Sequence, residues 1–369
     1  MMKGVEGRSS SVGLSKLRID LLRQLWLTAT LALTDTVGDK AALDALKPYF
    51  VHHGKYIATM VTKMGVKMET PLDIFNGSAP GNILVNRTRI KGELRENGVV
   101  YTAMDCATKG RSSVACICQC KYVIDAFLDD ASPGRSMYMT QCLSEGDPCC
   151  SWAIAQMGRS HFHLGAKVAD LAPPPVSKED MEGGAAILGE YWAISTRSFV
   201  DMVGMDKALN ILRERQQALG AETAPRIITL VGKEKGTETI ERAMRTVGEA
   251  FGMIGEEDPE GDGIMGFEIS ACPFSGAPVE VCQQYQAFLN GVISAIEPRY
   301  QLSYDRMMTK GDSTCHWAVR KKGLINRSST EAELNDPIKR LTNKFIDGEI
   351  SEEEFDRKIA HLRKHGIVK

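Results

Sequence analysis

The sequence has few of the features that mark the largest functional classes. No apolar run reaches the roughly 20 residues that a membrane-spanning helix needs, so we expect no membrane partner. The formal net charge of −2 gives no general attraction for nucleic acid, so we expect no nucleic-acid partner either. The chain also has no G-x-G-x-x-G after a predicted strand, no G-x-x-x-x-G-K-[ST] and no H-E-x-x-H. These absences exclude the most recognisable dinucleotide, phosphate and zinc-protease motifs.

A recognisable secretion signal is missing as well. The apolar stretch L-W-L-T-A-T-L-A-L is short, follows charged residues at helical spacing and has no evident small-residue cleavage site. In such a chain the 10 cysteines are expected to be reduced thiols, metal ligands or catalytic groups rather than disulfides. We therefore expect a cytoplasmic protein, with an ordinary core because 43% of its residues are hydrophobic.

The most distinctive feature is a cysteine framework that occurs twice. Residues 146–152 read G-D-P-C-C-S-W, and residues 311–317 read G-D-S-T-C-H-W. An outer and an inner cysteine precede each segment, 10 positions apart in both cases (106 to 116 and 272 to 282). The next spacing is 34 positions in one case and 33 in the other (116 to 150 and 282 to 315). The recurring spacing predicts an internal repeat, and a site rather than scattered core thiols.

Other residues recur with the same offset and place the domain boundaries. An offset of 166 relates three pairs: Trp26 and Trp192, Gly38 and Gly204, Gly54 and Gly220. The offset is 165 for Gly146 and Gly311, which predicts one deleted residue between the inner cysteines and these glycines. We expect a first α+β unit at 12–165, a Pro-rich linker at 166–177 and a second α+β unit at 178–322.

Hydrophobic periodicity predicts the same order of elements in both units. Helices come first, and a small antiparallel sheet follows, on which the helices pack. The middle of the first unit (73–98) contains N-G-S-A-P-G-N and is expected to be rich in loops.

The C-terminal segment 334–365 has the signals of a helical hairpin. Asp336-Pro337 begins a helix, Asp347-Gly348 ends it, and Ser351 with Glu354 forms a capping box for a second helix. The segment is similar to the short C-terminal domain called SHOCT. A unit this small buries little apolar surface alone, so it should dock on the body or on another copy. The resemblance implies a homo-oligomer or a protein partner bound through this hairpin.

The second unit carries a resemblance that suggests an activity. Its segments C-P-F-S-G-A-P-V-E-V-C and R-M-M-T-K-G-D-S-T-C-H-W, within 267–319, resemble the L-2-amino-thiazoline-4-carboxylic acid hydrolase family. This resemblance implies hydrolysis of a cyclic C–N bond in a small thiazoline-like carboxylic acid.

The first unit also resembles the 4-vinyl reductase type of small-molecule-binding domain. That resemblance implies an α+β fold and zinc bound by cysteines that fall on Cys116, Cys142 and Cys150. The family's acidic ligand falls on Met139, which has no carboxylate, so Cys106 is the candidate replacement.

The cysteines themselves leave several chemistries open. Four in the first unit (Cys106, Cys116, Cys142 and Cys150) suffice for a closed structural zinc site. The second unit has only Cys272, Cys282 and Cys315, because Met307 replaces the equivalent of Cys142. Three ligands would leave one position open, as in a catalytic site. The alternative is that all are buried apolar thiols.

A thiolate nucleophile needs no metal. Cys282 begins a predicted helix, whose N-terminus lowers a thiol pKa, and Cys116 occupies the matching position. His316 follows Cys315 and is a candidate base, unless strand alternation points it to the other face.

Three further residues are candidates for substrate binding. Arg306 would bind a substrate carboxylate, and it is specific to the second unit. Trp317 would either stack on a ligand or anchor the last strand. Asp312, like Asp147, either contacts substrate or closes a G-D turn.

The leading hypothesis from the sequence is a hydrolase that uses a Cys nucleophile or a Cys-bound metal. The alternative is a non-enzymatic small-molecule-binding or assembly protein with a structural Cys-zinc site.

Overall fold

A computed structural model describes residues 11–86, 90–156, 164–232, 236–258 and 265–322. It combines helices with two antiparallel sheets, which confirms the expected α+β class. Within the described residues, no helix is both long and apolar enough to cross a membrane. The hairpin expected at 334–365 lies outside the described residues.

The N-terminal half, residues 11–171, contains helices followed by a five-stranded sheet of order β3-β4-β2-β1-β5. Strand β5 falls in the range expected to be a linker, where it pairs antiparallel with β1. Its elements are α1 (Ser11–Val37), α2 (Asp39–Lys63), α3 (Pro71–Asn86), β1 (Ile90–Arg95), β2 (Gly98–Ala103), α4 (Ser113–Cys116), the π-helix η1 (Ile117–Val123), α5 (Ile124–Ala131), β3 (Arg135–Gln141), the 3-10 helix η2 (Leu143–Glu145), β4 (Cys150–Gln156) and β5 (Lys167–Leu171).

The C-terminal half, residues 178–321, contains helices and a four-stranded sheet of order β6-β7-β9-β8. Its elements are α6 (Lys178–Val203), α7 (Met205–Val231), α8 (Thr237–Ala250), β6 (Ile254–Asp258), β7 (Met265–Ala271), α9 (Val279–Ile296), β8 (Tyr300–Arg306), the 3-10 helix η3 (Met308–Lys310) and β9 (Cys315–Lys321).

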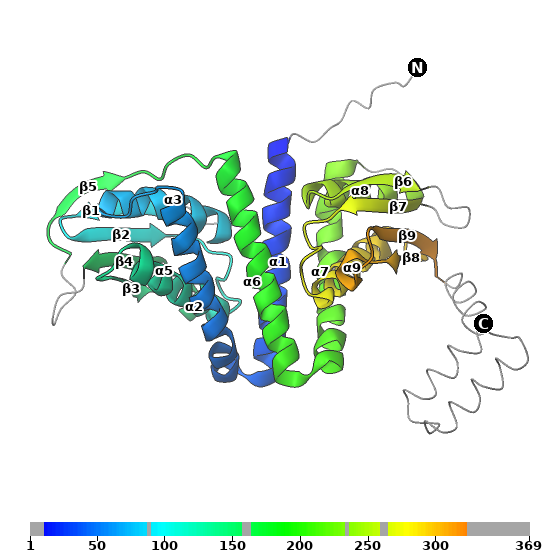
Figure 1. Cartoon of the computed structure of the whole chain (residues 1–369), viewed down its shortest axis with the longest axis horizontal. Helices are drawn as coiled ribbons and strands as arrows, with labels where there is room; N and C mark the ends of the chain where they lie inside the picture. The colour runs from blue at the N-terminus through cyan, green and yellow to red at the C-terminus, as the bar shows by residue number, and fades with distance from the viewer. Residues whose placement is uncertain (1–10, 87–89, 157–163, 233–235, 259–264, 323–369) are drawn as a thin grey trace, which may run out of the picture.

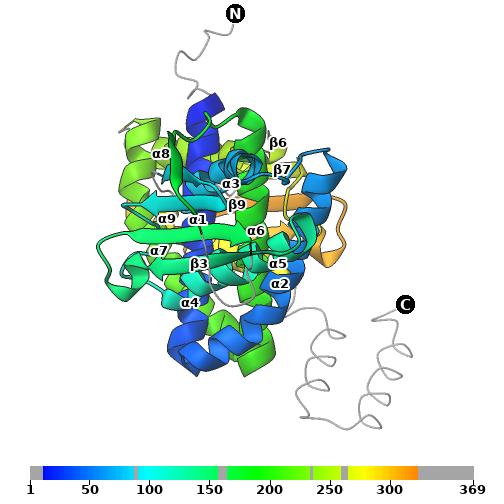
Figure 2. The same ribbon diagram turned by 90° about the vertical axis from the view of Figure 1, so that its left-hand side faces the viewer.

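The two long helices α1 and α6 stand side by side in the middle of the molecule, with one sheet on each outer side (Figure 1). When the molecule is turned by 90°, the N-terminal sheet lies in front of these helices (Figure 2). Helix α1 also packs on α7 and α8, whereas α6 packs on α2 and α3. Each half therefore extends its first helix onto the other half.

Polar contacts hold α1 on the C-terminal half. Arg226 of α7 forms an ion pair with Asp20 at 2.5 Å, and Arg215 forms one with Asp35 at 2.7 Å. The amide of Gln216 donates to the carbonyl oxygen of Leu25 at 3.1 Å, inside the core. Because a buried amide left without a partner is costly, this last contact fixes the position of α1 along α7.

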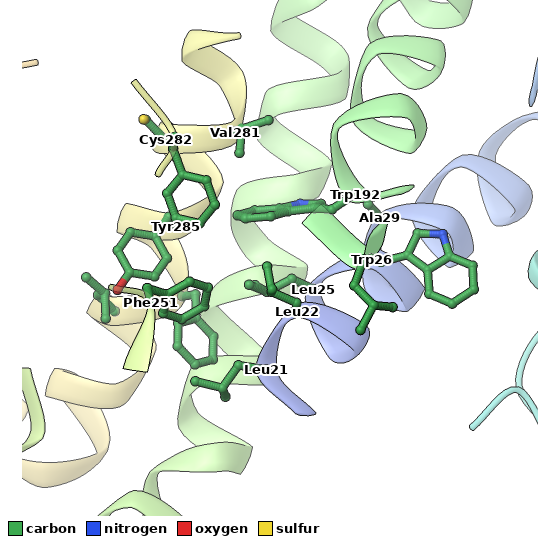
Figure 3. Packing of buried hydrophobic residues seen from close by; sticks show 14 of the residues in the cluster. Leu21, Leu22, Leu25, Trp26, Ala29, Trp192, Phe251, Val281, Cys282 and Tyr285 are labelled. Carbon is green, nitrogen blue, oxygen red and sulfur yellow. The ribbon is translucent and has the colours of Figure 1, made fainter. Parts of the chain in front are cut away.

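Apolar side chains fill the space between the central helices and α9 (Figure 3). Leu22 and Leu25 of α1, Trp192 of α6, and Phe251 and Tyr285 belong to one buried cluster. Burial of such side chains contributes roughly 1.5–3 kcal/mol each. The cluster spans both halves, so the halves share one core. A smaller cluster lies between α3, α5 and the N-terminal sheet.

Helix α3 corrects the expectation of a loop-rich segment at 73–98. It begins with a capping box, in which Asp73 N donates to Thr70 Oγ1 (3.2 Å) and Thr70 N donates to Asp73 Oδ2 (2.9 Å). Phe75 is fully buried and packs on Tyr101 of the sheet. The guanidinium of Arg23 binds carbonyl oxygens in the last helical turn. Tertiary contacts thus stabilise a helix whose Gly and Pro content favours a loop.

Candidate thiol site

The N-terminal half brings two of the predicted cysteines into direct contact. Cys116 ends the short helix α4, whose N-cap Ser112 accepts a hydrogen bond from Ala115 N at 3.0 Å. Cys142 follows the edge strand β3 and precedes η2. Their Sγ atoms lie 3.5 Å apart, although 26 positions separate the residues in the chain.

A tight turn positions Cys142 and Cys150. Asp147 Oδ2 accepts a hydrogen bond from Cys142 N at 2.7 Å, and Cys150 Sγ accepts one from Leu143 N at 3.2 Å. Gly146 takes the left-handed φ of 96° that the turn needs. Asp147 therefore shapes the backbone beneath the thiols.

The environment of Cys116 favours a thiolate. Side-chain hydrogen bonds, first from Cys120 and then from Ser144, Cys142 and Thr108, lower the pKa of Cys116 to about 6 despite its burial. The opposite shift occurs at Cys142, where burial raises the thiol pKa above its ordinary value. Two touching thiols are thus held in different protonation states at neutral pH.

The remaining thiols of this group stay protonated. The hydrogen bond to Cys116 and the loss of hydration on burial raise the pKa of Cys120 well above its ordinary value. Burial raises the pKa of Cys150 to about 12 and also raises that of Cys106. Cys106 and Cys150 lie close enough to Cys120 that ionisation of either would raise its pKa further, so the five sulfurs belong to one group. We call this group, Cys106, Cys116, Cys120, Cys142 and Cys150, the thiol cluster.

A half-open cleft of about 560 Å³ adjoins the thiol cluster. Residues of β3 form one wall, and Cys142 lies in the lining while Cys116 lies behind it, only 2% exposed. The charged lining residues are Lys121, Asp125, Glu145 and Asp147. Lys121 is paired with Asp125 at 2.9 Å, so the cleft has an excess of acidic groups.

The helical segment that begins with α4 and carries Cys116 is one residue longer than α9, its counterpart in the C-terminal half. Segments α4, η1 and α5 have 4, 7 and 8 residues and run without a break from position 113 to 131, whereas α9 has 18 residues. The N-caps Ser112 and Pro278 are 166 positions apart. Farther along, Gly54 packs against the Val123 carbonyl and Gly220 against the Phe288 carbonyl, and these carbonyls are 165 positions apart. The extra residue therefore lies within 113–123, and the helix accommodates it as the π-helix η1, a feature common at functional sites.

In the C-terminal half, the predicted nucleophile Cys282 lies in the first turn of α9, as expected. Burial, however, raises its pKa to about 11, against a hydrogen bond from Thr309. Burial likewise raises the pKa of Cys272 to about 12 and raises that of Cys315. Ionisation of Cys282 or Cys315 would raise the pKa of Cys272 further, so the three cysteines are neighbours. All three are thiols at neutral pH, which makes them weaker nucleophiles than Cys116.

His316 lies on the opposite face of β9 from Cys315, because strand neighbours alternate. Its Nδ1 lies 2.9 Å from Asp305 Oδ2, and Arg320 pairs with the same carboxylate. Arg306, which was expected to bind a substrate carboxylate, instead pairs with Glu268 at 2.5 Å. The two side chains proposed to work with the second-unit thiols therefore belong to an ionic network on the other face of the sheet.

Trp317 and Asp312 have structural positions. Trp317 is 3% exposed and packs against Phe267 and Tyr304 in the core. Asp312 Oδ2 accepts a hydrogen bond from Met307 N at 2.7 Å, as Asp147 does from Cys142. These positions agree with the structural alternatives, in which Trp317 anchors the last strand and Asp312 closes a turn.

Sequence reasoning missed three donors to Cys116, namely Cys120, Ser144 and Thr108. Cys120 follows Cys116 by four positions, a spacing that places side chains on one helical face, so it gave a usable signal. Ser144 lies in the single-turn 3-10 helix η2 and Thr108 in a turn before α4, and neither has a sequence spacing to Cys116 that predicts the contact.

The donor positions fit a zinc ion only in part. Within the described ranges, no group of three or more His, Cys, Asp or Glu side chains is placed to hold a metal ion. The Cys116–Cys142 separation of 3.5 Å nevertheless approaches the roughly 3.8 Å expected between two thiolates on one tetrahedral zinc with Zn–S bonds of about 2.3 Å. Cys106 and Cys150 would have to turn toward this pair to complete the set.

No protein-family model matches the chain, and no curated protein matches it. The family memberships expected from the sequence therefore stay predictions.

Proposed function

We propose that this protein is a thiol-dependent hydrolase that opens a cyclic C–N bond of amidine type in a small molecule. The reacting pair is Cys116 and Cys142 of the N-terminal half. One observation carries the proposal: two sulfurs 3.5 Å apart have pKa values shifted in opposite directions. Such a divergence assigns a nucleophile and an acid within one site.

The pair supplies both groups that the reaction needs. The Cys116 thiolate attacks the amidine carbon, forms a C–S bond and displaces the ring nitrogen as the C–N bond breaks. The Cys142 thiol gives its proton to that nitrogen. Water then adds to the thioimidate carbon and returns a proton to Cys142, and Cys116 leaves as the thiolate.

The cleft limits the substrate class. Its volume of about 560 Å³ suits a small molecule. Its acidic excess favours a neutral or cationic amidine group over an anion. The carboxylate implied by the family resemblance gains no support from this cleft, so we assign only the amidine part of the substrate.

We also infer that the two halves are copies of one ancestral unit. The matching turns support this inference: Gly146 and Gly311 both have φ of 96°, and Met308 N binds Cys315 Sγ at 3.1 Å as Leu143 N binds Cys150. The C-terminal copy has Met307 in place of the acid Cys142. In this proposal it acts as a scaffold and the N-terminal copy does the chemistry.

The test uses 2-aminothiazoline-4-carboxylate and 2-aminothiazoline, which differ only in the carboxylate. Disappearance of each compound is followed by chromatography under reducing conditions. Cys116→Ser should lower turnover by about 100-fold or more, whereas Cys282→Ser should retain most of it. The assignment to the N-terminal half would be contradicted if Cys116→Ser kept full turnover while Cys282→Ser lost about 100-fold. Absence of turnover of both compounds would contradict the proposed substrate class.

A second candidate is a small-molecule-binding protein whose zinc is held by Cys106, Cys116, Cys142 and Cys150. The Sγ–Sγ separation of 3.5 Å favours it, since two of the sulfurs already have nearly the spacing of zinc ligands. Zinc there would deprotonate the thiols and hold the turn to α4. Elemental analysis of anaerobically purified protein tests this: zinc in the native chain that is lost in Cys150→Ala supports it, and zinc-free native protein contradicts it.

A further inference from the structure

The contact between Cys116 and Cys142 has a property that the proposed hydrolysis does not use. Two sulfurs 3.5 Å apart need to approach by only about 1.5 Å to reach the disulfide bond length of about 2.05 Å. The residues come from different elements, the end of α4 and the segment after β3. A bond between them would therefore tie the helix to the edge of the sheet.

An oxidant can reach this pair from the cleft. Cys142 lies in the lining, and Ile117, the neighbour of Cys116, lies in it as well. Cys149 is nearby in sequence but its Sγ donates to Gln141 Oε1 at 3.0 Å, so it has a separate environment. The C-terminal half has methionine at position 307 and lacks the second thiol of the pair.

We propose that hydrogen peroxide links Cys116 and Cys142 in a reversible disulfide that switches the thiol site off. This inference rests on the proposed function, because the activity that the disulfide would switch off is the hydrolysis by this reacting pair. The bond would make both residues unavailable together. The N-terminal half alone has the switch, because only it carries both sulfurs.

The chemistry balances with peroxide as the oxidant. The Cys116 thiolate attacks one peroxide oxygen, the O–O bond breaks, and uptake of a proton gives sulfenic acid and one water. The Cys142 sulfur then attacks the Cys116 sulfur, an S–S bond forms, and hydroxide leaves with the Cys142 proton as a second water. A dithiol reductant restores both thiols by exchange.

The experiment treats the full-length chain with about one equivalent of hydrogen peroxide, followed by iodoacetamide and peptide mass spectrometry. We expect a 116–142 cross-linked peptide, a mass loss of about 2 Da in the intact chain, and loss of Cys116 alkylation that dithiothreitol restores. In Cys142→Ser, Cys116 should instead be trapped as a sulfenic acid by dimedone. Cys149→Ser is the matched control and should cross-link like the native chain.

Three outcomes would overturn the proposal. They are a bond from Cys116 to Cys120, sulfinic acid at Cys116 without any cross-link, and a cross-link that dithiothreitol does not reverse.

Failure of the disulfide proposal can be distinguished from failure of the proposed hydrolytic function. If the reversible cross-link forms but Cys116→Ser still hydrolyses both thiazolines, the disulfide stands and the hydrolytic role does not. If the cross-linked chain keeps full turnover that Cys116→Ser loses, the hydrolytic role stands and the switch does not.

Discussion

Gly54 of α2 packs so closely on the helix around Val123 that a Cβ atom at position 54 would overlap the Val123 carbonyl oxygen. Because backbone forms this contact, a side-chain rotation cannot relieve it. We expect Gly54→Ala to lower the free energy of unfolding by about 1–3 kcal/mol, the usual cost of overpacking. Urea unfolding followed by circular dichroism measures this.

The matched control is Gly183, an exposed residue of α6 that has open space around its Cβ position. Gly183→Ala should stabilise the protein by about 0.5–1 kcal/mol through helix propensity. Equal stabilities for the two variants would show that α2 and the π-helix do not pack as closely as described.

The rate of Cys116 alkylation should depend on pH with a midpoint near 6, because only the thiolate reacts. Cys120→Ala removes the largest of the hydrogen bonds that lower this pKa, so the midpoint should rise. Cys149→Ala leaves those donors intact and should not move it. Residue-resolved iodoacetamide labelling across a pH series measures all three, and an unmoved midpoint in Cys120→Ala would refute the role of Cys120.

Cys116 should also make stability depend on pH. Its pKa is lower in the folded chain than the ordinary value of 9.0, so the folded chain releases this proton first. The contribution is fully present above the ordinary value and is lost as the pH falls through the folded pKa near 6. The difference in unfolding free energy between the native chain and Cys116→Ser should therefore grow from pH 6 to 9. A constant difference over that range would argue against a stabilised thiolate.

Gln284 connects polar groups within the shared core. Its Oε1 accepts hydrogen bonds from Trp192 Nε1 (3.0 Å) and Gln216 Nε2 (3.3 Å), and its Nε2 donates to Thr196 Oγ1 (2.8 Å). We expect Gln284→Leu to cost about 2–4 kcal/mol, since it leaves several buried groups without partners.

The control for Gln284 is its neighbour Gln283, whose Oε1 has no hydrogen-bond partner in the described chain. Gln283→Leu should change the unfolding free energy by less than about 1 kcal/mol. If both variants unfold at the same denaturant concentration, the polar network does not stabilise the core as we infer.

Part of the fold could be predicted because the information is local. Cysteine and glycine spacing predicted that the segments around Gly146 and Gly311 correspond, and a helical start predicted the position of Cys282. Side chains that meet only in the folded chain could not be predicted. Cys116 and Cys142 approach because α4 packs against η2, and no local sequence pattern records a contact between these two segments.

The differences between the expected and the observed surroundings of the candidate residues have the same physical origin. Sequence adjacency suggested that His316 assists Cys315, but strand alternation separates them. The helical start favoured Cys282 as the nucleophile, but a thiol pKa also depends on donors from other segments, and these lower the pKa of Cys116 instead. The one-residue offset was visible in the sequence. Its accommodation as a π-helix could not be predicted, because it depends on contacts that fix both ends of the helical segment 113–123.

The placement of α1 on the C-terminal half has a consequence during synthesis. The amide that fixes α1, on Gln216, is 191 positions beyond the carbonyl of Leu25 that it binds. The apolar face of α1 thus emerges from the ribosome long before α6 and α7 exist to cover it. Such an interval exposes nascent chains to aggregation. The core around α1 can therefore close only after the second half of the chain has been translated.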